Sequence, residues 1–203
     1  MTSTFDARAQ TWDEDPRRVK LAADIFAALD RAVSLRAEMA ALDYGAGTGL
    51  LALPLAARVR RVLAVDASAG MLAVLAQKAR AGGCANVETR HADFAQDALP
   101  AGPFDLVVSA MTLHHVADVA DLLRKFFVLL APGGRIALAD LDAEDGSFHG
   151  PDTPGVHHLG FDRAELAAKL EAAGFAEIRF ADAARSEKNG RAYSVFIAAA
   201  RKP

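Results

Sequence analysis

The chain has 203 residues, of which 52% are hydrophobic and 24% charged, a composition typical of one globular domain and unlike that of a disordered segment. Its formal net charge is −3 and Lys and Arg form no large cluster, which argues against a nucleic-acid-binding surface. Residues 1–18 lack the apolar segment of a signal peptide, and no apolar run approaches the length of a membrane span. The single cysteine, Cys84, excludes an internal disulfide. We therefore expect a cytoplasmic protein.

Strand-like and helix-like segments alternate through most of the chain, which predicts a parallel sheet with helices on both faces. The first helix is indicated by apolar residues at helical spacing after Pro16. The expected elements, in chain order, are a helix over 15–31, a strand over 39–43, a short helix over 50–57, a strand over 61–65, a helix from Ser68 to Arg80, strands over 86–90 and 104–110, a helix ending at Leu130, and a strand over 135–140.

The last third of the chain departs from this alternation. Residues 141–161 form a polar stretch rich in Gly and Pro, and loops of this length are usually functional or mobile. A helix then begins with a capping box at Asp162. Strands are expected over 175–181 and 192–200, with a polar loop over 182–191 between them. Because no helix joins these two strands, we expect them to be antiparallel.

Three glycines with the spacing G-x-G-x-G follow the first expected strand: Gly45, Gly47 and Gly49. Glycine lets the backbone turn sharply and approach a ligand closely, and a helix that begins there points unpaired N–H groups at it. Asp43 lies two residues before this loop, and Asp66 ends the next expected strand, where a carboxylate can accept hydrogen bonds from ribose hydroxyls. The alternatives are a tight turn without a ligand and a helix N-cap at Asp66.

The order and spacing of several segments resemble class I S-adenosylmethionine-dependent methyltransferases. The segments similar to motif I, the ribose and adenine segment, the adenine-edge segment, motif IV and the turn before the fifth strand are 42–49, 65–71, 91–94, 104–109 and 130–134, respectively. The opening from Phe5 to Asp13 is similar to that of small-molecule enzymes of this class, such as the ubiquinone and menaquinone biosynthesis methyltransferases. The resemblance implies an α/β fold with a seven-stranded, mostly parallel Rossmann-like sheet, an antiparallel last strand and helices on both faces.

The same resemblance implies that S-adenosylmethionine is the cofactor, S-adenosylhomocysteine the product and a small molecule the methyl acceptor. We expect one domain over 1–203, with an N-terminal helical or lid segment over 1–35 and a substrate-side loop over 141–161. The residues expected to bind the cofactor are Asp43, Gly45, Ala46, Gly47, Thr48, Gly49, Asp66, Ala67, Met71, Asp93, Phe94 and Ser109.

Three of these positions have more than one interpretation. Asp43 can hold the glycine loop by accepting backbone N–H bonds, or approach the ammonium group of the methionine part. Asp93 can accept the adenine amino group, with a backbone contact from Phe94, or be a plain turn aspartate. Met71 can belong to the core or provide an apolar surface under adenine.

His114 and His115 follow the fourth expected strand, where the acceptor would meet the transferred methyl group. An imidazole titrates near neutrality and can take a proton from an acceptor hydroxyl, so both are candidate catalytic bases. The alternative is a pair of loop histidines that only pack or cap.

Further candidate substrate or lid residues are Trp12 in the N-terminal segment and His149, His157 and His158 in the long loop. We expect no metal site, because the histidine spacing matches neither H-E-x-x-H nor a Cys/His cluster. The acidic run over 140–145 is interpreted as a solvated loop, with a Mg²⁺ site as the alternative.

Missing signatures narrow the function. The sequence over 109–112 lacks the Asp/Asn-Pro-Pro-aromatic motif for exocyclic base amines, no glutamate lies within 105–140, and Cys84 is not preceded by proline. Nucleic-acid and arginine methylation are therefore not indicated. A dinucleotide-dependent oxidoreductase is a weaker alternative, because Tyr-x-x-x-Lys is absent. A non-catalytic S-adenosylmethionine-binding module stays open, since methyl transfer requires no particular side chain, and the sequence indicates no oligomeric state.

Overall fold

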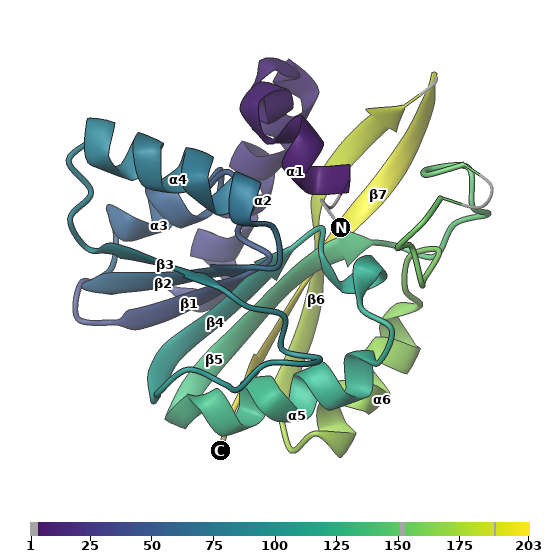
Figure 1. Cartoon of the computed structure of the whole chain (residues 1–203). Coiled ribbons are helices and arrows are strands. Elements are labelled where there is room, and N and C mark those ends of the chain that lie inside the picture. Colours follow the sequence, from purple (N-terminus) through teal and green to yellow (C-terminus); the bar gives the residue numbers. More distant parts are fainter. Residues whose placement is uncertain (1–3, 151–152, 189) are drawn as a thin grey trace.

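The centre of the computed structural model is a seven-stranded sheet with the order β3-β2-β1-β4-β5-β7-β6 (Figure 1). The structure describes residues 4–150, 153–188 and 190–203. The strands are β1 Ala40–Tyr44, β2 Arg61–Asp66, β3 Val87–His91, β4 Phe104–Ala110, β5 Leu130–Leu141, β6 Ala176–Lys188 and β7 Arg191–Arg201. Strand β7 runs antiparallel to both β5 and β6, and the strands from β3 to β5 pair in parallel. The expected fold is thereby confirmed.

Helices cover both faces of this sheet. The helical elements are α1 Thr4–Arg8, the 3₁₀ helix η1 Ala9–Glu14, α2 Pro16–Val33, α3 Ala52–Ala56, α4 Ala69–Ala81, the 3₁₀ helix η2 Leu113–His115, α5 Val119–Leu129 and α6 Arg163–Ala172. Helices α2, α3 and α4 lie on one face, and α5 and α6 lie on the other (Figure 1). No helix in the described ranges is long and apolar enough to cross a membrane.

Alternating side chains of β1 build a separate core on each face. Ala41 belongs to the cluster that contains Leu55 of α3 and Leu75 of α4. Its neighbour Leu42 belongs to the cluster that contains Phe126 of α5. Burial on both sides explains why the central strands are continuous apolar runs in the sequence.

Side-chain caps define where the helices begin. Each cap accepts a backbone N–H within the first turn, which satisfies a donor that the helix itself leaves unpaired. The capping residues are Asp15 for α2, Ser68 for α4, Asp118 for α5 and Asp162 for α6.

The prediction of a polar loop over 182–191 is wrong. Strand β6 continues to Lys188, and its pairing with β7 runs from Ala176 opposite Arg201 to Lys188 opposite Arg191. A hairpin that extends into solvent needs backbone pairing and no apolar pattern, so its polar residues resemble a loop. The dipeptide Asn189-Gly190, typical of two-residue hairpin turns, was the signal that could have revealed it.

The long segment after β5 returns to the sheet edge where β4 and β5 end. Its two ends pair with each other, since the N–H of Ala143 donates to the carbonyl of Phe161 at 3.0 Å and that of Glu144 donates to Leu159 at 2.9 Å. Further along, the N–H groups of His157 and His158 both donate to the carbonyl of His114, at 2.8 and 3.2 Å. These bonds bring the segment against η2.

Candidate active site

The glycine loop follows β1 and turns through three residues with positive φ, at +75° for Gly45, +54° for Gly47 and +86° for Gly49. A Cβ on Gly45 would collide with the Thr112 side chain, and one on Gly49 would lie 2.8 Å from Cγ of Leu75. A Cβ on Gly47 would meet no atom of the described residues within 4 Å. The outer two glycines therefore allow close packing, while the central one borders open space.

Asp66, at the end of β2, connects this loop to the beginning of α4. Its Oδ2 accepts the N–H of Gly47 at 2.8 Å, and its Oδ1 accepts the N–H of Ser68 at 2.8 Å. Burial raises the pKa of Asp66, while these two N–H bonds oppose the shift. The side chain that caps α4 is Ser68, so Asp66 is not the N-cap. A carboxylate oxygen can accept more than one hydrogen bond, which leaves Asp66 able to bind a further donor.

Asp43 lies inside the sheet, between Ala64 of β2 and Val108 of β4. Its side chain is 1% exposed, and its Oδ2 has no hydrogen-bond partner among the described residues. Burial, with a smaller contribution from Asp66, raises the pKa of Asp43 to about 8. The N–H groups of Gly45 and Ala46 donate to the carbonyl of Val65 and not to Asp43, so Asp43 does not hold this part of the loop.

The residues expected near adenine have partners within the protein. Asp93 accepts the N–H of Ala95 at 2.9 Å and so holds a turn, and the Phe94 ring is buried 4.8 Å from the ring of Tyr44. Ser109 donates its hydroxyl to the carbonyl of Tyr44 at 2.8 Å, which joins β4 to β1. Met71 is buried in the first turn of α4. These bonds account for the positions of the side chains, and their contact with a cofactor stays a prediction.

The N-terminal segment packs over the glycine loop and the beginning of α4. Asp6 accepts the Ser68 hydroxyl at 2.6 Å, and Asp13 accepts the Thr48 hydroxyl at 2.6 Å. The Lys78 ammonium group lies 2.6 Å from Asp13 and also donates to the carbonyl of Thr48 at 2.9 Å. The N-terminal segment therefore lies against the glycine loop and the first turn of α4.

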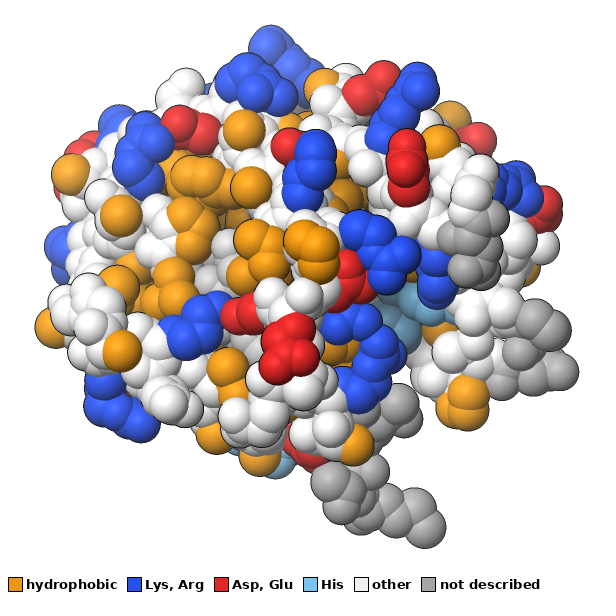
Figure 2. All heavy atoms as spheres, turned by 90° about the horizontal axis from the view of Figure 1, so that it is seen from above, with side chains coloured by type: hydrophobic (Ala, Val, Ile, Leu, Met, Phe, Trp, Pro, Cys, Tyr) orange, Lys and Arg blue, Asp and Glu red, His pale blue; other side chains and the backbone are white. Residues whose placement is uncertain are grey.

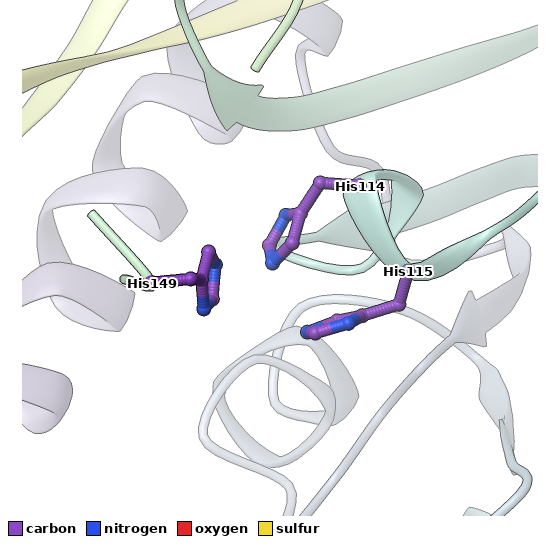
Figure 3. Close-up of side chains that lie close together, drawn as sticks. All are labelled: His114, His115 and His149. Atoms are coloured by element: carbon purple, nitrogen blue, oxygen red, sulfur yellow. The ribbon is translucent and has the colours of Figure 1, made fainter. Parts of the chain in front are cut away.

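Three histidines meet beside this segment, although they come from different parts of the chain. His114 and His115 lie in η2, directly after β4, and His149 lies in the long segment after β5. The ring centroids are 4.1 Å apart for His114 and His115, 4.8 Å for His114 and His149, and 5.6 Å for His115 and His149. Figure 3 shows the three rings pointing toward one another.

Each ring of this histidine cluster has a distinct environment. Nδ1 of His114 lies 2.7 Å from Oδ1 of Asp140, and both side chains are almost fully buried. Nδ1 of His115 lies 2.7 Å from the carbonyl oxygen of Gly155, and Nε2 of His149 is buried with no partner among the described residues. Burial lowers the pKa of His115, and burial with the neighbouring imidazoles lowers the pKa of His149 to about 4. His149 is therefore neutral at pH 7.

The other expected substrate residues lie around the cluster. Trp12 has the Arg18 guanidinium 4.0 Å from its ring centroid and the Phe5 ring at 5.9 Å, and Phe5 in turn meets the His115 ring edge-on at 5.3 Å. Nε2 of His158 is bound to the carbonyl of Val116 at 2.9 Å, and the side chain of His157 is exposed. The N-terminal segment thus reaches the histidine cluster through Phe5.

The acidic run over 140–145 is exposed at Asp145, as the sequence suggested, but its first two acids, Asp140 and Asp142, have partners within the fold. Asp140 is fully buried against His114. Asp142 forms an ion pair with Arg163 at 2.6 Å, and Asp145 forms one with Arg191 at 2.6 Å. The correction has a simple cause: the cations come from distant parts of the sequence, so nothing local revealed the pairing.

Residues 41–134, which include the glycine loop, Asp66 and η2, match the family model of the Methyltransferase domain. Over this range the chain is similar to methyltransferase domains. It is similar to an uncharacterised methyltransferase of Geobacillus kaustophilus, with 33% identity over 147 residues that cover 70% of this chain and 64% of that protein. It is also similar to the ubiquinone biosynthesis O-methyltransferase of Caulobacter sp., with 41% identity over 102 residues that cover 50% of this chain and 40% of that one. The matches thus span less than two thirds of each relative.

Among solved structures, the phosphoethanolamine N-methyltransferase 2 of Haemonchus contortus in complex with S-adenosyl-L-methionine has the same fold as this chain. Its TM-score is 0.74 at 19% identity, over 88% of this chain and 52% of that chain. The family match and this likeness confirm the class I methyltransferase resemblance and the Rossmann-like sheet that the motifs indicated.

Proposed function

We propose that this chain transfers a methyl group from S-adenosylmethionine to a small-molecule acceptor. The observation that carries the proposal is the buried Oδ2 of Asp43, which has no hydrogen-bond partner in the described part of the chain. It lies next to a glycine loop whose central residue, Gly47, borders open space. An unpaired buried carboxyl oxygen is costly, and a cationic ligand group removes that cost. S-adenosylmethionine carries an ammonium and a sulfonium group, so its charge complements Asp43. The family match and the S-adenosylmethionine complex of the Haemonchus relative support the same cofactor.

In this proposal the residues of the chain bind and orient, while the cofactor supplies the reactive methyl group. Gly47 lets the backbone approach the ligand, Asp66 accepts ribose hydroxyls, and Asp43 meets the ammonium group. The N-terminal segment over 1–35 and the loop over 141–161 exclude water and align the acceptor within the single domain 1–203. Alignment alone can lower the activation free energy by about 7–11 kcal/mol.

Cationic side chains lie near the histidine cluster, where we place the acceptor. They favour an acceptor with a carboxylate or phosphate group. The Lys188 ammonium lies 4.7 Å from the ring centroid of Phe148, and that ring lies 4.8 Å from His149. Burial lowers the pKa of Lys188, and repulsion by Arg8 and Arg18, among others, adds to the shift. Figure 2 shows Lys and Arg side chains gathered beside histidine side chains on this face. Nothing in this arrangement suggests a macromolecular partner.

Calorimetry tests the cofactor. We expect binding of S-adenosylmethionine and S-adenosylhomocysteine, with no comparable binding of NADH or NADPH. Asp66→Ala should weaken cofactor binding about 30–150-fold, since charged hydrogen bonds contribute roughly 2–3 kcal/mol, whereas Glu88→Ala, an exposed acid on β3, should not. Binding of a nicotinamide cofactor without S-adenosylmethionine binding would contradict the proposal.

A transfer assay separates an enzyme from a non-catalytic binding module. Radiolabelled S-adenosylmethionine is incubated with the chain and a cell extract, with Asp66→Ala as the control. We expect label in the acidic small-molecule fraction and none in protein or nucleic acid. Cofactor binding with no labelled product in any fraction would favour the binding module.

A further inference from the structure

We propose that His114, His115 and His149 form a binding site for a divalent transition-metal ion, with Zn²⁺ as the best match. One ring nitrogen from each histidine lies within 4.8 Å of those of the other two. Imidazole nitrogens around a tetrahedral zinc ion bind at about 2.0–2.1 Å, which places them about 3.4 Å apart. The nitrogen atoms therefore have to approach one another by at most about 1.4 Å when the ion binds.

The atoms behind the rings are those that metal-binding histidines require. A metal-bound imidazole usually donates its other N–H to a carboxylate or a carbonyl, which selects the tautomer and the ring orientation. The carboxylate of Asp140 has this position behind His114, and the carbonyl of Gly155 has it behind His115, both at 2.7 Å from Nδ1. With Nδ1 as the donor to these oxygens, the neutral form of each ring has no proton on Nε2, the atom that can bind a metal ion.

His149 provides an independent observation. Its Nε2 is buried and has no hydrogen-bond partner among the described residues, although buried polar atoms in folded proteins are nearly always paired. In their neutral forms, His114 and His115 have no proton on Nε2 and so cannot donate a hydrogen bond from that atom to His149. A metal ion satisfies all three nitrogens at once, which a purely packed group of rings does not (Figure 3).

Three histidines leave a fourth tetrahedral position open, as in zinc sites that bind water or substrate. The ion would also join η2 to the segment after β5, on the side that faces Phe5. An oxygen or nitrogen atom of the acceptor can occupy the open position. This last role rests on the proposed methyl transfer, whereas metal binding itself does not.

The test uses the full chain without an affinity tag of histidines, treated with a chelator and then dialysed. Zn²⁺ is titrated by calorimetry and Co²⁺ by visible absorption, because tetrahedral Co²⁺ gives intense bands. We expect one equivalent of either ion. Asp140→Asn should lower the affinity about 10–100-fold, and His149→Ala should lower it further and abolish the tetrahedral spectrum. The control His91→Ala, an exposed histidine bound to the carbonyl of Ala67, should leave both unchanged.

Two results would overturn the metal site: no stoichiometric Zn²⁺ binding by the intact chain, or an affinity that His149→Ala does not change. His149 is preferred over the buried His114 as the test position because its substitution leaves the sheet and η2 in place. Binding of S-adenosylhomocysteine is measured on the same samples. A chain that binds Zn²⁺ but no S-adenosylhomocysteine would contradict the proposed function and support the metal site.

Discussion

Replacing Asp43 with asparagine tests whether the burial of this carboxyl group makes the stability of the fold depend on pH. The substitution keeps the size of the side chain and removes its ionisation. In the wild-type chain, burial raises the pKa of Asp43 to about 8, far above the ordinary value of 3.8. The folded state therefore holds a proton that the unfolded state has already released at neutral pH.

The sign of the pH dependence follows from this difference. A folded pKa above the unfolded pKa gives a stabilisation that is complete below pH 3.8 and is lost as the pH rises to about 8. Between pH 6 and 8 the folded state binds up to one more proton than the unfolded state. Integrating that difference gives a loss of about 2 kcal/mol in the free energy of unfolding. The asparagine variant lacks this loss, because its side chain has no charge to desolvate.

The assay is urea unfolding of cofactor-free wild type and Asp43→Asn at pH 6 and pH 8. Other titrating groups are common to both proteins, so the difference between the two pH dependences isolates Asp43. We expect the wild type to lose about 2 kcal/mol more than the variant. Equal pH dependences would refute the reasoning, because they would mean that Asp43 is charged in the folded state at pH 6.

The same variant reports on the ligand. A cationic group near Asp43 favours the charged carboxylate, so binding of S-adenosylmethionine at pH 7 should release a proton. The calorimetric enthalpy of the wild type should then depend on the ionisation enthalpy of the buffer. That of Asp43→Asn should not.

Two further predictions concern residues around the proposed cofactor site. Gly47→Ala should weaken S-adenosylhomocysteine binding and cost about 1–2 kcal/mol of stability through its left-handed backbone, whereas Gly45→Ala should lower the melting temperature further because its Cβ collides with Thr112. Calorimetry and thermal melts distinguish the two variants. Equal cofactor affinities for wild type and Gly47→Ala would contradict the proposed approach of the ligand to Gly47. Asp13→Asn should raise the dissociation rate of S-adenosylhomocysteine in stopped-flow measurements. It should change the free energy of unfolding by less than about 1 kcal/mol, because the partly exposed ion pair with Lys78 is screened by solvent. An unchanged dissociation rate would mean that the N-terminal segment is not a lid.

The sequence was most informative where one short segment determines the geometry. The loop from Gly45 to Gly49 needs positive φ at three glycines, so its spacing alone predicted the turn after β1. The caps at Ser68 and Asp162 likewise act on N–H groups two or three residues away. Where geometry depends on distant partners, the prediction was poorer. The partners of Asp140 and Asp142 are His114 and Arg163, which lie elsewhere in the chain, so the local sequence could not indicate these pairs.

The histidine cluster could be predicted only in part, and the reason lies in the topology. Strands β4 and β5 are parallel neighbours, with Ala110 opposite Ala139, so the residues that follow them must meet at one edge of the sheet. That argument alone places His114 close to Asp140. It does not place His149, which reaches the cluster because the segment after β5 folds back on η2 through bonds from later residues to the carbonyl of His114. Spacing rules for metal motifs describe ligands on one element or two adjacent ones. A site assembled by tertiary folding from η2 and an irregular segment has no such signature and becomes visible only when the rings and the acceptors behind them are placed together.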